Sequence, residues 1–229
     1  NPQFFEELQE DLKYVEYFEF TGGEPFMIKN HFKILEYCVE KGYAKNQDIH
    51  YNTNGTQLPG PEIFDLWKHF KRVEIAFSID DVGEPFEYQR YGAKWKEVNY
   101  NLNQFKMYQT NNMEFQICST INIFNIFSLA KLVLWVRQFN PKFFYVNTCF
   151  DPDIFNIQTL PKQIKNIVNS RYDDLKDFEG TLRYMNSVDR DSEDIRDQRK
   201  KRILQTDSYR KENFGEVFPL LNKVLKIYE

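Results

Sequence analysis

Short runs in which apolar and polar residues alternate recur along the first two-thirds of the chain. They are separated by stretches in which apolar residues repeat every three or four positions. The alternating runs predict β-strands at residues 16–20, 48–52, 73–79, 115–121 and 143–148. The stretches between them predict helices at residues 31–42, 61–71, 95–109 and 126–139. Strands that alternate with helices predict an α/β fold with parallel strands joined by right-handed crossovers.

Each predicted strand has one apolar and one polar face. In residues 73–80, Val73, Ile75 and Phe77 alternate with polar Glu74 and Ser78. Strands buried on both faces inside a closed barrel would be apolar on both. The pattern therefore predicts an open partial barrel with a polar lumen. The residues expected to point into this one cavity are Glu19, Asn52, Ser78, Thr120 and Asn122.

The last third of the chain lacks the strand pattern. From about residue 160 onward the periodicity is helical only, and it ends with the apolar segment EVFPLLNKVLKIY at residues 216–228, for which we expect one closing helix. We therefore predict a barrel domain over residues 1–160 and a C-terminal helical extension over residues 161–229.

Composition narrows the class of protein. A net charge of −4 and a pI near 5.6 argue against a dedicated nucleic-acid-binding protein. No apolar run approaches the ~20 residues of a membrane helix, so no membrane association is expected. Three widely spaced cysteines, Cys38, Cys118 and Cys149, fit a reducing compartment, for which we expect the cytoplasm, and show no metal-binding spacing.

The predicted strand ends carry four motifs in order. They are TGGEPF at 21–26, YNTNGTQLP at 51–59, FSIDDVGEPFEYQRYGAKW at 77–95 and STINIFN at 119–125. Paired glycines at a strand end permit backbone conformations with positive φ and let a ligand approach the backbone closely. A pair of glycines at a strand end, followed by an acid and a proline, therefore indicates a loop shaped to receive a ligand.

Taken together, the motifs over residues 15–160 resemble the radical S-adenosylmethionine (SAM) superfamily, and within it the twitch-domain radical SAM proteins. The resemblance implies a partial (β/α)6 barrel that holds SAM and a [4Fe–4S] cluster. About five parallel strands are visible here, which correspond to the second to sixth strands of that barrel. The implied activity is reductive cleavage of SAM to a 5′-deoxyadenosyl radical that acts on an unknown substrate.

The resemblance also implies which residues bind SAM. Gly22, Gly23, Glu24 and Pro25 form the loop that takes the methionine ammonium group, which requires backbone carbonyls and a carboxylate as acceptors. Ser78 and Asp80 face the ribose hydroxyls or the methionine carboxylate. The remaining expected SAM-binding residues lie beside them on the polar face and are Asn52, Asn54, Thr120 and Asn122. No catalytic residue is assigned.

One motif of the superfamily is missing from the sequence. The cluster-binding CxxxCxxC would precede GGEP, and this chain does not contain it, so no metal ligand is assigned here. The chain also does not begin with Met, and we expect it to be part of a longer protein whose cluster segment lies elsewhere. This chain alone is expected to be inactive. The alternative is a non-catalytic barrel that binds a ligand or a protein.

Several further expectations concern partners and loop residues. The substrate, a small molecule or a peptide, cannot be identified from the sequence. With the first strand missing, the GGEP-bearing strand would be a sheet edge, which the N-terminal segment, the C-terminal helices or a second copy in a homo-oligomer would cover. Glu87, Arg90 and Trp95 are expected to form a structural clamp, and Asp81 to serve as a turn residue.

Overall fold

The computed structural model describes residues 3–172 and 178–228. The chain forms two compact units, each made of more than one segment. Unit 1 contains residues 1–78, 96–118 and 139–145, and unit 2 contains residues 79–95, 119–138 and 146–229. The sequence-based division at residue 160 remains a prediction.

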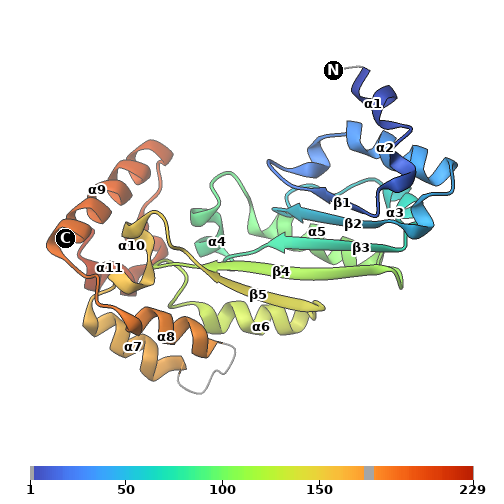
Figure 1. The fold of residues 1–229 in the computed structure, drawn as a ribbon. Helices are drawn as coiled ribbons and strands as arrows, with labels where there is room; N and C mark the ends of the chain where they lie inside the picture. Colours follow the sequence, from blue (N-terminus) through green and yellow to red (C-terminus); the bar gives the residue numbers. More distant parts are fainter. Residues whose placement is uncertain (1–2, 173–177, 229) are drawn as a thin grey trace. The chain divides into compact units, whose positions relative to one another are not determined.

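Five parallel strands form one sheet in the order β1-β2-β3-β4-β5, with flanking helices (Figure 1). The strands are β1 (Tyr17–Phe20), β2 (Asp48–Thr53), β3 (Arg72–Ser78), β4 (Met113–Ile121) and β5 (Phe143–Thr148). Each one overlaps a predicted strand, because the alternating pattern reflects a sheet with one buried face. The predicted α/β class with about five parallel strands is confirmed.

The register sets side chains of neighbouring strands into rows. Phe18 pairs with Ile49, which pairs with Val73, and Asn52 pairs with Ala76, which pairs with Gln116. Rows alternate between the two faces because side chains on successive residues of a strand point to opposite sides. Residues at the carboxyl ends of adjacent parallel strands therefore lie at one edge of the sheet.

The helices of unit 1 cover the apolar face of the sheet and form an aromatic core. Tyr51 of β2 contacts Trp67 at 5.3 Å between ring centroids, and Phe77 of β3 contacts Phe105 at 5.1 Å. These tilted and edge-to-face pairs are the arrangements that aromatic rings prefer. The helical elements of this unit are α1 (Gln3–Leu8), η1 (Leu12–Tyr14), η2 (Pro25–Met27), α2 (Asn30–Glu40), η3 (Ala44–Asn46), α3 (Pro61–Trp67) and α5 (Trp95–Met107).

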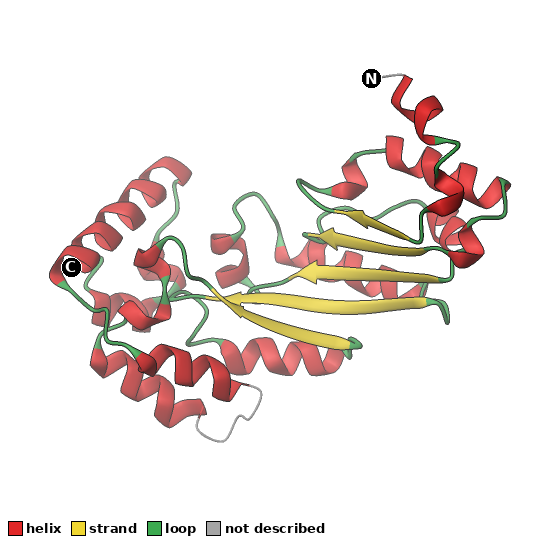
Figure 2. Cartoon of the chain, viewed as in Figure 1, coloured by secondary structure: helices red, strands yellow, loops and turns green. Residues whose placement is uncertain are grey.

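After β5 the described chain is helical (Figure 2), as the loss of the strand pattern predicts. The elements there are η4 (Asp153–Phe155), η5 (Ile157–Thr159), α7 (Lys162–Tyr172), α8 (Glu179–Ser187), α9 (Glu193–Arg210), α10 (Phe214–Val217) and α11 (Pro219–Leu225). Unit 2 also contains α4 (Glu84–Gln89) and nearly all of α6 (Leu129–Phe139), which come before β5 in the chain. Asp207 of α9 accepts hydrogen bonds from the hydroxyls of Tyr88 (2.8 Å) and Tyr228 (2.7 Å), which fix this long helix within unit 2.

The expected single closing helix at 216–228 is wrong. The segment contains two helices, α10 and α11, separated at Phe218. Pro219 disfavours the helical conformation of the residue before it, and Phe218 accordingly has φ −124° and ψ 61°. No helix in the described residues is long and apolar enough to cross a membrane.

Burial in β3 follows the predicted alternation of apolar and polar residues. Val73, Ile75 and Phe77 are fully buried, whereas Ser78 is half-buried. On the other face of the sheet, only 1 % of Ala76 and 7 % of Gln116 is exposed. Ala76 lies in a row between Asn52 and Gln116, and Gln116 donates a hydrogen bond to Glu74 (3.3 Å).

Candidate functional site

The loop after β1 has an open backbone at its two glycines. Gly22 and Gly23 have φ of 85° and 60°, a conformation that favours glycine because it lacks a Cβ. A Cβ at either position would meet nothing within 4 Å, so the glycines are required by backbone conformation and not by crowding. Within the described residues neither carbonyl accepts a hydrogen bond, which leaves both as acceptors.

Glu24 connects this loop to the end of β2. Its Oε1 accepts hydrogen bonds from the Thr53 hydroxyl (2.8 Å) and from the backbone N–H of Phe26 (3.3 Å). Its Oε2 accepts from the backbone N–H of Asn54 (2.9 Å). The side chain is buried, with 7 % of the residue exposed. The carboxylate thus fixes the GGEP loop against the neighbouring NTNG loop.

The negative charge of the Glu24 carboxylate indicates which kind of ligand could bind beside the GGEP loop. All three donors are neutral, and the described residues provide no ion pair to this carboxylate. A buried carboxylate is costly unless it is paired or well hydrogen-bonded. An ionised carboxylate has about four acceptor positions, of which three are filled. The remaining capacity and the two free glycine carbonyls fit an ammonium group.

The other predicted residues of unit 1 differ in how far they are already engaged. Asn54 accepts from both the backbone N–H and the hydroxyl of Thr56, so its side chain stabilises its own turn. Asn52 and Ser78 are half-buried and make no side-chain hydrogen bond with the described residues. Their polar groups therefore remain available to a ligand, while Pro25 starts the short helix η2.

In unit 2, Asp80 follows β3 and is neutralised by a cation. Its Oδ2 accepts from Nε (3.0 Å) and Nη2 (2.7 Å) of Arg90, and its Oδ1 accepts from the backbone N–H of Thr120 (2.8 Å). Glu87 accepts from the backbone N–H of Trp95 (2.9 Å). These contacts agree with the clamp expected from Glu87, Arg90 and Trp95.

Asn122 is held by a network that the sequence does not reveal. Its Nδ2 donates to Gln89 Oε1 (3.0 Å), and its Oδ1 accepts from the backbone N–H of Phe124 (2.8 Å). Asn125, which is fully buried, donates to the carbonyls of Asp80 and Thr120, each at 2.9 Å. Asn125 therefore joins the ends of β3 and β4, and no spacing rule distinguishes it from the other asparagines of this loop.

Asp81 is more than a turn residue, which corrects the sequence-based expectation. It is fully buried, and it accepts from the Ser128 hydroxyl (2.5 Å) and from the backbone N–H of Val82 (2.8 Å). Burial raises the pKa of this carboxyl to about 6, because the charged form is poorly solvated. The next residue after Asp80 thus supports the loop from inside unit 2.

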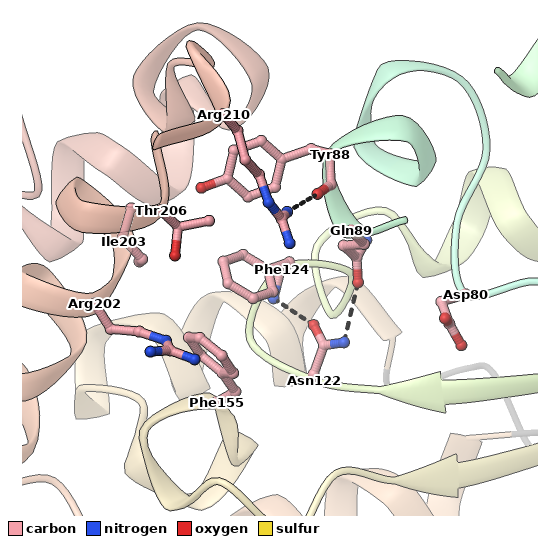
Figure 3. A pocket seen from close by; sticks show the side chains of 10 residues that line it. All are labelled: Asp80, Tyr88, Gln89, Asn122, Phe124, Phe155, Arg202, Ile203, Thr206 and Arg210. Atoms are coloured by element: carbon pink, nitrogen blue, oxygen red, sulfur yellow. Dashed lines mark hydrogen bonds between the residues drawn. The ribbon is translucent and has the colours of Figure 1, made fainter. Parts of the chain in front are cut away.

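A pocket of about 260 Å³ lies in unit 2 (Figure 3). Asp80 and Asn122, two of the predicted SAM-binding residues, line it together with Gln89. The opposite wall comes from one helix, α9, which the motif-based interpretation of the sequence did not include. The complete lining is Asp80, Tyr88, Gln89, Asn122, Phe124, Phe155, Arg202, Ile203, Thr206 and Arg210.

The described residues do not fit an iron–sulfur cluster. Cys38 is buried in α2, where burial raises the pKa of its thiol to about 11, which disfavours the thiolate that a metal requires. No group of three or more His, Cys, Asp or Glu side chains that could hold a metal occurs in residues 3–172 and 178–228. The predicted absence of metal ligands from this chain stays a prediction.

The comparisons with known proteins establish the fold. No family model matches the chain, and no curated protein sequence matches it. The solved structure of native anSMEcpe with bound AdoMet is similar at a TM-score of 0.55 and 20% identity, over 80% of this chain and 57% of that one. The structure of anSMEcpe with bound AdoMet and the Cp18Cys peptide gives 0.54 and 19%, over 78% of this chain and 54% of that one.

A third solved structure, Streptococcus suis SuiB bound to S-adenosylmethionine, is similar at a TM-score of 0.52 and 14% identity. The match covers 74% of this chain and 38% of that chain. This chain therefore spans between 38% and 57% of the length of these three structures.

Proposed function

We propose that this chain is the SAM-binding barrel portion of a radical SAM enzyme. The loop Gly22–Glu24 would take the methionine ammonium group, and Asn52 and Ser78 would offer free polar groups on the same face of the sheet. Solved structures with this fold hold the same ligand, which supports the choice of SAM.

The observation that carries the proposal is the unneutralised carboxylate of Glu24. It is buried, receives only neutral donors and lies next to two glycine carbonyls without hydrogen-bond partners. A cationic ammonium group is the ligand chemistry that satisfies all three acceptors. SAM carries such a group.

Radical formation requires a further group that this chain does not hold. A [4Fe–4S] cluster on cysteines outside the chain would supply the electron that cleaves the sulfonium bond. The residues described here bind and orient the cofactor, and none of them is assigned the cleavage. The substrate on which the radical acts is also unassigned.

The test is calorimetric titration of the chain with SAM and with 5′-methylthioadenosine, which lacks the amino-acid part. A few hydrogen bonds without metal chelation predict a Kd of about millimolar for SAM and weaker binding of the analogue. Glu24→Gln should remove the preference for SAM. Glu40→Gln, which removes an exposed carboxylate at the end of α2, is the matched control and should leave it unchanged.

Two outcomes separate the alternatives. Micromolar binding of SAM by the isolated chain, lost in Glu24→Gln, would favour a non-catalytic binding module that needs no cluster. Equal binding of both compounds, or binding insensitive to Glu24→Gln in a variant that circular dichroism shows to be folded, would refute the proposed site. Thr53→Val weakens the loop contact but keeps the charge, so it should retain the preference for SAM.

A further inference from the structure

One face of α9 presents donors to the pocket of unit 2. Arg202, Thr206 and Arg210 are spaced four residues apart, so they lie on the same side of the helix. Figure 3 shows Arg202 and Arg210 approaching the pocket beside the rings of Phe155 and Phe124. Guanidinium groups only donate hydrogen bonds, and a hydroxyl can donate one. The wall can therefore donate to an acceptor group of a ligand, and Arg202, the most exposed of the three, is also accessible from solvent.

The acidic and amide groups of the pocket are already engaged elsewhere. Both oxygens of Asp80 accept hydrogen bonds, two of them from Arg90. The amide groups of Asn122 and Gln89 bond to each other and to backbone or carboxylate atoms nearby. None of these three side chains pairs with an arginine of α9, so their charges and dipoles do not neutralise that wall.

The two arginines differ in how they are held. Arg210 donates from Nη1 to the Tyr88 carbonyl (3.2 Å), lies over the Tyr91 ring at 4.9 Å, and is 3.9 Å from a carboxylate oxygen of Glu212. Arg202 makes no hydrogen bond or ion pair with the residues that the structure describes. Its neighbours three and four positions away on the helix are Gln198, Arg199, Gln205 and Thr206, so α9 offers it no acid.

The rest of the cavity is apolar. Phe124 and Phe155 lie with their ring centroids 4.9 Å apart, and Tyr88 lies 5.8 Å from Phe124. Such rings favour a planar or apolar group. The pocket thus combines an aromatic floor with a cationic wall whose arginine at position 202 is unpaired.

We propose that the α9 wall binds an anionic group, a carboxylate or a phosphate, of the enzyme's substrate, with the apolar part of that substrate against Phe124 and Phe155. The proposal rests on the proposed function only in calling this ligand the substrate. The binding of the anion itself requires neither SAM nor a cluster. Arg202 supplies the free charge, Thr206 a hydroxyl, and Arg210 its remaining N–H groups.

The experiment titrates the 229-residue chain with three ring compounds, followed by two-dimensional ¹H–¹⁵N spectra. Phenyl phosphate and phenylacetate carry the two anions, and benzyl alcohol is the neutral control. We expect a Kd of about millimolar for at least one anion and at least tenfold weaker binding of the alcohol. Whichever anion binds more tightly identifies the group, and equal binding supports an anion site open to both.

Matched variants on the same helix make the test specific. Arg202→Gln should weaken anion binding at least about fivefold, while Arg202→Lys keeps part of it. Lys201→Gln removes the same charge from the next residue, which does not line the pocket, and should have no effect. Binding of benzyl alcohol as tight as the anions, no binding of any probe, or equal loss in Arg202→Gln and Lys201→Gln would overturn the proposal.

The two proposals fail separately. Glu24→Gln should leave phenyl phosphate and phenylacetate binding unchanged, because Glu24 belongs to unit 1 and does not line this pocket. If Glu24→Gln loses the preference for SAM but still binds the anions, the result would support both proposed sites. Retained anion binding in a chain that shows no SAM preference would leave the anion site standing and refute the proposed function.

Discussion

Each unit places an acidic residue just after a strand, but the two acids are satisfied in opposite ways. Glu24, after β1, receives one hydroxyl and two backbone N–H groups. Asp80, after β3, receives two N–H groups of the Arg90 guanidinium and one backbone N–H. The first carboxylate keeps its charge available, whereas the second is neutralised within its own loop.

This difference suggests a division of roles between the two loops. A carboxylate with a built-in arginine is a structural element, since its charge is already compensated. A buried carboxylate with neutral donors is stabilised by its hydrogen bonds but keeps an uncompensated negative charge, which a cationic ligand can pair with. We therefore expect substitutions at Glu24 to affect both ligand preference and stability, and substitutions at the Asp80–Arg90 pair to affect stability alone.

The largest expected effect follows from Glu24→Gln. A glutamine side chain has one acceptor oxygen in place of two. Either the N–H of Asn54, or the Thr53 hydroxyl and the Phe26 N–H, therefore lose their acceptor. We expect the free energy of unfolding to fall by about 4 kcal/mol, because hydrogen bonds to charged groups contribute about 1.5–3 kcal/mol each. Urea denaturation measures the change.

Thr53→Val provides the matched control for that loss. It preserves shape and removes only the hydroxyl donor to Glu24 Oε1, so it should lower the free energy of unfolding by about 2 kcal/mol. A loss in Glu24→Gln no larger than that in Thr53→Val would mean that the backbone donors contribute little, and the description of Glu24 as the centre of the loop would be wrong.

Asp81 predicts a pH dependence of stability. Its pKa in the folded chain is about 6, above the ordinary value of 3.8, so the folded state binds the proton more tightly. The stabilisation by the neutral acid is complete below about pH 4 and is lost as pH rises through about 6, a decrease of about 3 kcal/mol. Asp81→Asn should flatten this part of the pH profile of urea denaturation, and an unchanged profile would contradict the assignment.

Arg90→Gln tests the neutralised side of the comparison. It leaves Asp80 with only the Thr120 N–H and should lower the free energy of unfolding by about 2 kcal/mol, since the pair is mostly buried. Arg90→Lys keeps the positive charge but cannot donate two hydrogen bonds from one planar group, so it should restore about half of the lost free energy of unfolding. Raising the salt concentration should narrow the gap between wild type and Arg90→Gln, because salt screens ion pairs.

The strands were predictable because a half-buried sheet imposes a period of two on the sequence. Ile49, Tyr51 and Thr53 are buried in β2 as the alternation requires. The break at Phe218–Pro219 was missed because apolar periodicity continues through it, although the proline itself is a visible signal. Periodicity identifies faces, whereas helix ends depend on single residues.

The candidate site was predictable only in part, for a related reason. The paired glycines and the acidic residues mark strand ends in the sequence, but the partner of each acid lies far along the chain. Thr53 is 29 residues from Glu24, and Asn125 is 45 residues from Asp80. The pocket wall on α9 is more distant still, and its arginines are indistinguishable in the sequence from those of a solvated helix.

The smallest expected effect on stability separates ligand contacts from loop contacts in unit 1. Asn52 and Ser78 have no side-chain hydrogen bond to the described residues, so Asn52→Ala and Ser78→Ala should each change the free energy of unfolding by no more than about 0.5 kcal/mol. If Asn52 and Ser78 contact SAM, each substitution should still weaken SAM binding by about threefold to tenfold, because a hydrogen bond contributes about 1 kcal/mol.

Asn54→Ala is the contrasting variant. The Asn54 side chain accepts two hydrogen bonds from Thr56, so its removal should lower the free energy of unfolding by about 1 kcal/mol. A loss of stability in Ser78→Ala as large as that in Asn54→Ala would place Ser78 among the structural residues and remove it from the proposed site.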